Sequence, residues 1–134
     1  MKSKLIEEKS CGCIILNDKK VLLVHQNKGN WGFPKGHVED NETEQETAIR
    51  EVKEETNIDV QIKNNKRFSE QYITDKGTLK EVIYFVANPI SEDIKPQEEE
   101  IQEIKWVNIN DAFDIISYDN TKEMFKEALK EMNL

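Results

Sequence analysis

The strongest constraint in this sequence is a helix signal over residues 43–56. Thr43, with Glu46 three residues later, has the spacing of a capping box, in which each side chain bonds the backbone N–H of the other residue. The apolar positions that follow at helical spacing are Ala48, Ile49 and Val52. Asn57 comes next, and asparagine adopts the left-handed conformation of a helix C-terminus more easily than most residues do. We therefore expect one amphipathic helix that ends at about Thr56.

Three carboxylates share one side of this helix. Glu51, Glu54 and Glu55 lie at positions i, i+3 and i+4. Like charges at this spacing destabilise a helix by roughly a few tenths of a kcal/mol per pair. Such a cluster is either a solvated helix face or a site where a hard divalent cation neutralises the charge, since Mg²⁺ prefers oxygen ligands. The spacing alone leaves both interpretations open.

Apolar runs elsewhere in the chain predict a sheet. Residues 11–25 contain two such runs separated by a turn-forming cluster, which is the pattern of a β-hairpin. Residues 31–38 combine glycine and proline with two aromatic residues, and we expect a shaped loop there. Residues 58–68 and 80–88 are predicted strands, joined through a turn at 75–77.

The last third of the chain begins with an acidic segment and ends with a predicted helix. Residues 91–105 are predicted to form an acidic loop, which leads into a short strand over residues 105–109. The C-terminal helix is expected at residues 120–132, where Asn120 and Glu123 have the spacing of a second capping box.

Composition and charge exclude several classes of protein. The chain has 27 acidic and 19 basic side chains, a formal net charge of −8, so long nucleic acid would be repelled and an anionic ligand would need a metal ion. No run of about 18 apolar residues is present, and the charged N-terminus lacks a signal peptide's apolar stretch, which predicts a cytoplasmic protein. Cys11 and Cys13 lie one residue apart and exclude a disulfide framework. With no repeat or linker, residues 1–134 are expected to form a single domain.

The helix and the loop before it carry a fixed pattern of residues. Gly36 is followed after five residues by Glu42, and after seven more by the string REVKEETNI at positions 50–58. This segment resembles the Nudix box of the Nudix hydrolase family, G-x5-E-x7-R-E-U-x-E-E-x-G-U, in which U is a bulky aliphatic residue. Every fixed position matches except that Asn57 stands where the box has its last glycine. That glycine serves the backbone conformation, so the exchange leaves the carboxylates untouched.

The resemblance implies an α+β protein with the Nudix fold, an α/β/α sandwich around a mixed β-sheet. It also implies that the box holds divalent cations against a substrate diphosphate, with Mg²⁺ as the expected cofactor and Mn²⁺ as the alternative. Glu51 and Glu55 would be the principal ligands, and Glu54 would be a further ligand or the base that deprotonates the attacking water. Glu42 and Arg50 would form an internal ion pair that orients the helix, unless they are solvated and contribute under ~1 kcal/mol.

In relatives, a glutamate from a loop outside the box commonly completes the site. We choose Glu100 as this metal ligand and as the other candidate for the catalytic base, because it lies six residues before Trp106 and so resembles the loop glutamate that precedes the tryptophan-containing strand in relatives. The neighbouring glutamates that we weighed against it are Glu98, Glu99 and Glu103.

The string WGFPKGHVE at positions 31–39 resembles the W-x-x-P-K-G-H-x-E motif of the asymmetric diadenosine tetraphosphate hydrolases within that family. The resemblance implies that Lys35 and His37 contact the polyphosphate, with Lys80 as a further cation. An adenine would stack against a tyrosine, although either candidate could instead be an ordinary half-buried strand aromatic. The candidates are Tyr72 and Tyr84.

The implied activity is Mg²⁺-dependent pyrophosphohydrolysis, in which water attacks phosphorus and splits diadenosine tetraphosphate asymmetrically into ATP and AMP. One alternative is a broader Nudix hydrolase of nucleoside triphosphates, oxidised nucleotides or RNA 5′ ends. The other is a non-catalytic module that senses a nucleotide, although such a module has no need for intact glutamates. The expected partner is a nucleotide polyphosphate, with no membrane and no long nucleic acid, and the protein is expected to be a monomer or a weak dimer. Trp31 and His25 are interpreted as structural.

Overall fold

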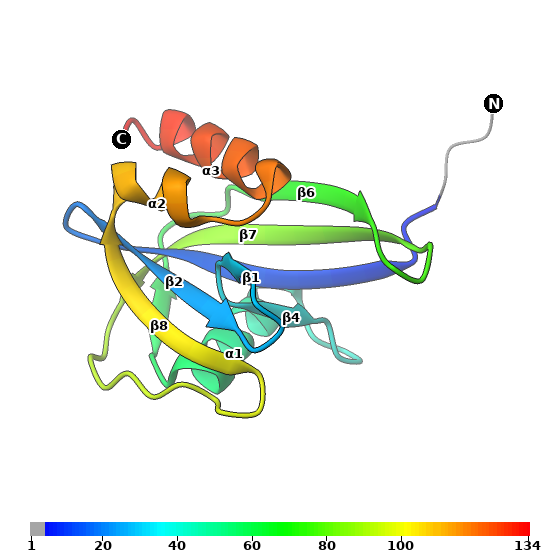
Figure 1. The fold of residues 1–134 in the computed structure, drawn as a ribbon, viewed down its shortest axis with the longest axis horizontal. Helices are drawn as coiled ribbons and strands as arrows, with labels where there is room; N and C mark the ends of the chain where they lie inside the picture. The colour runs from blue at the N-terminus through cyan, green and yellow to red at the C-terminus, as the bar shows by residue number, and fades with distance from the viewer. Residues whose placement is uncertain (1–4) are drawn as a thin grey trace.

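A computed structural model describes residues 5–134, and its elements follow one another as strands interrupted by one long helix and closed by two more (Figure 1). The strands are β1 (Glu8–Asn17), β2 (Lys20–Gln26), β3 (Trp31–Gly32), β4 (Lys35–His37), β5 (Val60–Ile62), β6 (Phe68–Ile73), β7 (Leu79–Pro89) and β8 (Ile101–Asn108). The helices are α1 (Glu44–Thr56), α2 (Ile109–Ile115) and α3 (Asp119–Glu131). Within the described chain, no helix is long and apolar enough to cross a bilayer.

The strands form a mixed sheet around β1. Strand β1 runs parallel to β7 and antiparallel to β2 and β4, while β7 also pairs with β5 and β6, and β2 with β3 and β8. The predicted hairpin at residues 11–25 is present as the β1–β2 pair, with Leu16 opposite Val21. Because β4 lies against β1, the residues just before the box are part of the sheet rather than a free loop.

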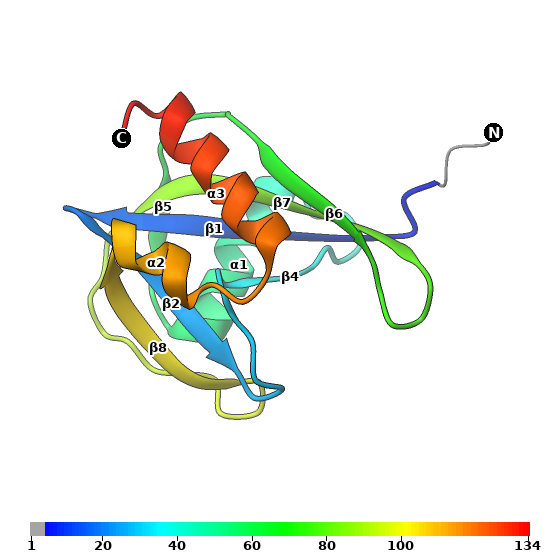
Figure 2. The ribbon, with the colours of Figure 1, turned by 45° about the horizontal axis from the view of Figure 1, so that its top comes forward.

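Two hydrophobic clusters lie on opposite faces of this sheet. One contains residues of α2 and α3, such as Ala112 and Phe125, and the other contains Ala48 and Val52 of α1. Figure 1 shows α1 below the strands with α2 and α3 above them, and Figure 2 shows α3 in front of β7 and β1, with β6 beside it. The predicted α+β sandwich of helices around a mixed sheet is therefore confirmed.

Helix α1 begins and ends where its local sequence predicted. Thr43 and Glu46 make both hydrogen bonds of the capping box, and Asn57 ends the helix in the left-handed conformation, with φ of 67°. Cys11 and Cys13 are free and buried in β1. These features depend on residues close to one another in the chain, which is why the sequence was sufficient to predict them.

The continuous strand predicted over residues 58–68 is wrong. The chain instead forms β5 and β6, separated by a turn, and both pair with β7. The Asn64 side chain accepts a hydrogen bond from the backbone N–H of Lys66 at 2.9 Å, so it satisfies a backbone group that a strand neighbour would otherwise bind. That local bond favours a turn at this position.

Two predictions near the C-terminus are also wrong. Strand β8 begins at Ile101, four residues earlier than expected, because it pairs with β2 along nearly its whole length. The second capping box is absent: Tyr118 is the N-cap of α3, and the Asn120 amide donates to the Gln71 carbonyl oxygen at 3.3 Å. Asn120 therefore ties α3 to the edge of β6 instead of capping its own helix.

We expect Gly12→Ala to destabilise the protein by about 1–3 kcal/mol, the usual cost of overpacking a core. A Cβ at position 12 would overlap the Pro34 carbonyl oxygen and lie 2.9 Å from the Lys35 Cα, so β4 would have to move away from β1. Urea unfolding measures the loss. Gly32→Ala is the matched control, because nothing lies within 4 Å of its added Cβ; equal stability losses in the two variants would contradict the explanation.

Candidate active site

Helix α1 approaches strand β4 most closely at Gly36. This residue pairs with Cys11 of β1, and the Glu51 carboxylate lies directly against its backbone. A Cβ atom at position 36 would overlap the Glu51 carboxyl carbon and both of its oxygens. Glycine is thus required here by a side chain from the helix, and the contact fixes the position of the Glu51 carboxylate against the sheet.

Glu51 and Glu55 form a buried carboxyl pair beside this contact. Glu55 is 2% exposed, and its Oε1 has no hydrogen-bond partner among the residues that the structure describes. Burial, followed by the charge of Glu51, raises the pKa of Glu55 to about 9. Burial likewise raises the pKa of Glu51, although Arg50 opposes that shift. A further positive charge at this pair would stabilise both carboxylates.

Arg50 connects the acidic residues around the pair. Its Nε and Nη2 donate to the two Glu42 oxygens at 2.6 and 3.0 Å, and its Nη1 donates to Glu51 at 2.9 Å and to Glu54 at 3.1 Å. Its Nη2 also donates to the His37 carbonyl oxygen at 3.1 Å. The Arg50 hydrogen bond lowers the pKa of Glu42 to about 2. Arg50 thereby joins the helix to the segment before it.

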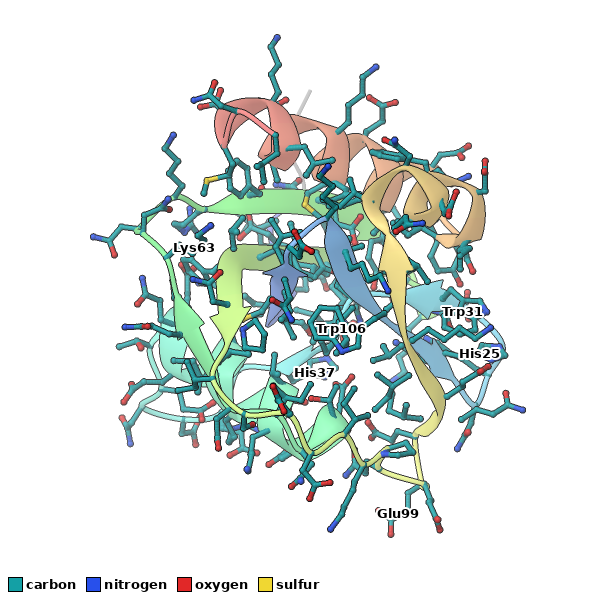
Figure 3. The ribbon with its side chains drawn as sticks, turned by 90° about the vertical axis from the view of Figure 1, so that its left-hand side faces the viewer. His25, Trp31, His37, Lys63, Glu99 and Trp106 are labelled. Atoms are coloured by element: carbon teal, nitrogen blue, oxygen red, sulfur yellow. The ribbon has the colours of Figure 1, made fainter. Side chains whose placement is uncertain are left out.

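The two candidates for the catalytic base, Glu54 and Glu100, are both exposed to solvent. Glu54 is exposed on α1 and bonded to Arg50. Glu100 is exposed in the turn before β8, and its charge contributes to the raised pKa of Glu55. Its neighbour Glu99 projects away from the molecule at the lower edge of Figure 3.

The carboxyl pair fits a divalent cation in its chemistry. Within residues 5–134, no group of three or more acidic, histidine or cysteine side chains is already gathered as a metal site. Glu51 and Glu55 nevertheless supply adjacent carboxyl oxygens, one of them buried and unpartnered, and hard oxygen ligands are those that Mg²⁺ and Mn²⁺ prefer. A cation there would satisfy the Oε1 atom of Glu55 and offset the repulsion between the pair.

A cavity of about 420 Å³ is lined by residues of β2, β3, β4, β6, β7 and the start of α3, and one of them, Lys35, interacts electrostatically with Glu51 and Glu55. Four of the five predicted substrate contacts line it, namely Lys35, Tyr72, Lys80 and Tyr84. His37 does not: its ring is exposed, and its Nε2 lies 3.2 Å from Glu8 Oε1. Glu8 lies on β1 two residues before Ser10, the partner of His37 in the sheet, and this register brings the two side chains together.

The lining of the cavity combines cations with aromatic rings. Burial lowers the pKa of Lys35, and it lowers the pKa of Lys80 to about 8, so both amino groups are partly desolvated. Tyr72 is half-buried, whereas Tyr84 is 1% exposed and packs edge-to-face against Phe33 with ring centroids 5.6 Å apart. Tyr84 therefore belongs to the core, with Tyr72 as the more accessible ring.

Several lining residues were not predicted as substrate contacts. Trp31 lines the cavity while stacking on His25, with ring centroids 4.5 Å apart and planes 7° from parallel (Figure 3). The others of note are Lys28, Glu70, Tyr118, Asn120 and Thr121. A signal for Glu70 was present in the sequence, because it stands between Phe68 and Tyr72 at an inward position of an alternating strand.

We expect Arg50→Lys to lower turnover roughly 10-fold, as loss of a group that orients metal-binding carboxylates does. Lysine cannot reproduce the forked contact with Glu42 while also reaching Glu51. Steady-state kinetics with Mg²⁺ would measure the effect. Arg67→Lys is the matched control. Arg67 Nε and Nη2 donate to the two Glu44 oxygens at 2.6 and 2.8 Å, and Arg67 does not line the cavity. Equal losses of activity in both variants would show that the effect is not specific to the site.

Comparison with known proteins finds a matching family, similar sequences and similar structures. The NUDIX domain matches residues 7–129. Nudix hydrolase 2 of Arabidopsis thaliana is 33% identical over 105 residues, which cover 72% of this chain and 37% of that protein. The bis(5′-nucleosyl)-tetraphosphatase [asymmetrical] of Rattus norvegicus is 28% identical over 136 residues, covering 90% of this chain and 92% of the rat protein. A crystal structure of a C. elegans Ap4A hydrolase binary complex superposes with a TM-score of 0.83 at 30% identity, covering 94% of this chain and 98% of that one.

Proposed function

The chain belongs to the Nudix hydrolase family, and from that premise we propose that it hydrolyses diadenosine tetraphosphate asymmetrically to ATP and AMP. The relatives that span most of this chain, the rat tetraphosphatase and the C. elegans Ap4A hydrolase, support this substrate over others in the family. The Arabidopsis relative is matched over only 37% of its length, so it adds support for the family but little for the substrate.

The observation that carries the proposal is that Lys35 lines the cavity and also interacts electrostatically with the Glu51 and Glu55 carboxylates. Burial is the main cause that lowers the pKa of Lys35; the charges of Glu55, Glu70 and Glu51 oppose this shift, and that of Lys28 adds to it. A phosphate chain that extended from the cavity to the carboxylates would therefore interact with the charge of the Lys35 amino group. Such an arrangement suits a long polyphosphate, because cations along the path offset its charge.

The residues at the carboxyl pair would perform the chemistry. Glu51 and Glu55 would hold Mg²⁺, or Mn²⁺ in its place, and the bound ion would polarise a phosphoryl oxygen and make water more acidic. Glu54 or Glu100 would take the proton of the attacking water, since both are exposed beside the pair. The water oxygen bonds to phosphorus, the anhydride P–O bond breaks, and its electron pair leaves with the departing phosphate.

The nucleoside would occupy the cavity. We propose Tyr72 for stacking on the adenine in preference to Tyr84, because Tyr84 is enclosed in the core. Tyr118, which is 56% exposed and lines the same cavity, is available as a second ring. Lys35 and Lys80 would contact the phosphates, and His37 would do so only if it left Glu8.

Turnover of a substrate panel tests the proposal. The protein is incubated with Mg²⁺ and dinucleoside polyphosphates, nucleoside triphosphates and 5′-triphosphorylated RNA, with the tetraphosphate reaction also run in ¹⁸O-labelled water. We expect ATP and AMP from diadenosine tetraphosphate, with the label in one of them. Fast hydrolysis of a nucleoside triphosphate with the tetraphosphate untouched would favour the broader Nudix activity, and binding without any hydrolysis would favour a sensing module.

A further inference from the structure

The cavity contains a carboxylate that the proposed chemistry does not use. Glu70 projects inward from β6, is 9% exposed, and shares the cavity with Lys28, Lys35 and Lys80. A carboxylate disfavours a phosphate group placed next to it, since both are anions. A phosphate placed directly against Glu70 is therefore disfavoured, and the phosphates of the proposed substrate would contact Lys35 and Lys80 instead.

The Glu70 carboxylate is held in place by uncharged groups. The Thr121 hydroxyl of α3 donates to its Oε2 at 2.8 Å, and the Tyr84 hydroxyl interacts with the same carboxylate. Burial raises the pKa of Glu70, while these two interactions and the charges of Lys35 and Lys80 oppose that shift. In the described part of the chain, no lysine or arginine forms an ion pair with Glu70. The carboxylate thus keeps acceptor capacity, because two oxygens offer about four lone-pair positions.

A buried acceptor with spare capacity is complementary to a hydrogen-bond donor. The phosphates of a nucleotide offer acceptors at neutral pH, whereas its nucleoside offers N–H groups on the base and O–H groups on the ribose. We propose, building on the proposed function, that Glu70 is a specificity-determining residue that accepts a hydrogen bond from the nucleoside, either from the base amino group or from the ribose 2′-hydroxyl. It orients the nucleotide by admitting the nucleoside and repelling phosphate.

Binding measurements on the whole protein test this inference without relying on hydrolysis. Calorimetry compares AMP with purine riboside 5′-monophosphate, which lacks the amino group, and with 2′-deoxyadenosine 5′-monophosphate. We expect the wild type to bind AMP roughly 10- to 100-fold more tightly than the analogue that lacks the donor, the usual range for a hydrogen bond to a charged group. The identity of the weaker analogue tells whether base or ribose supplies the donor.

The variants Glu70→Gln and Glu70→Met separate recognition from a structural role. Each should bind AMP about 10-fold more weakly and lose the discrimination between analogues. Each should also bind inorganic tripolyphosphate more tightly than the wild type does, because a repelling charge is gone. A purely structural role would weaken both ligands together. Glu127→Gln, which removes a charge from the exposed face of α3 outside the cavity, is the matched control and should change neither affinity.

Equal affinity of the wild type for all three monophosphates would overturn the inference, and this comparison needs no variant to fold. Parallel weakening of AMP and tripolyphosphate in both variants would overturn it as well. Failure of the protein to hydrolyse the tetraphosphate is a different result: it would refute the proposed function while the binding comparison still decides the role of Glu70.

Discussion

Replacing Glu55 with glutamine is expected to reduce turnover by about 10³-fold or more while the protein stays folded. The loss follows from removing one of the two carboxylates proposed to hold the cation, and electrostatic groups at a reacting phosphate or oxyanion contribute effects of this order. Kinetics with saturating Mg²⁺ would measure the loss, and direct Mn²⁺ titration would show weaker binding. Undiminished activity would rule out the proposed metal site.

The fold should tolerate this exchange because the Glu55 carboxyl is already difficult to ionise in the folded protein. Its pKa of about 9 lies above the ordinary value of 4.5, so the folded state keeps a proton that the unfolded chain releases between these pH values. Without divalent cations, the wild type should therefore lose stability as pH rises from about 4.5 to about 9, and Glu55→Gln should lose less. Urea unfolding in EDTA at pH 5 and pH 8 would measure the difference, with Glu127→Gln as the control that keeps the wild-type dependence.

Gly36→Ala is expected to weaken both Mn²⁺ binding and turnover by roughly 10- to 100-fold, as displacing a metal-binding carboxylate does. The added Cβ would occupy the space of the Glu51 carboxyl group, which must then rotate away. Because the displaced atoms end a flexible side chain, the stability of the fold should change little. Gly12→Ala, in which backbone is displaced, should show the opposite pattern of lost stability.

Titration of Mn²⁺ and urea unfolding of the same samples would separate these effects. Gly32→Ala is the matched control for Mn²⁺ binding, since its Cβ meets nothing within 4 Å. Wild-type affinity in Gly36→Ala would show that the close approach of Glu51 to β4 has no role in holding the cation.

The sequence predicted the box helix well because its determinants are local. Thr43, Glu46 and Asn57 act within a few residues of their own positions, and the structure has each in its expected conformation. The prediction of a continuous strand over residues 58–68 was wrong because of another local interaction. The hydrogen bond to the Asn64 side chain favours a turn between β5 and β6, although the apolar residues on both sides favour a strand.

The cavity could not be predicted to the same extent because distant segments build it. Trp31, Glu70 and Tyr118 come from β3, β6 and the segment before α3, and strand register decides which of them face one another. The difference between Lys35 and His37 shows the limit: they are two residues apart on β4, yet one lines the cavity and the other pairs with Glu8. The contact of His37 depends on Glu8 of β1, and the sequence motif around Lys35 and His37 does not include that strand.

The acidic segment before β8 is hydrogen-bonded to the end of α1. The backbone N–H of Gln97 donates to the Glu55 carbonyl oxygen at 3.1 Å, that of Lys95 to the Thr56 carbonyl oxygen at 2.9 Å, and the Asn57 amide to the Asp93 carbonyl oxygen at 2.9 Å. The last turn of the helix therefore cannot fray unless this segment lifts as well. Amide hydrogens at both places should exchange with solvent at a common rate, which a cation held by Glu55 would slow in both together.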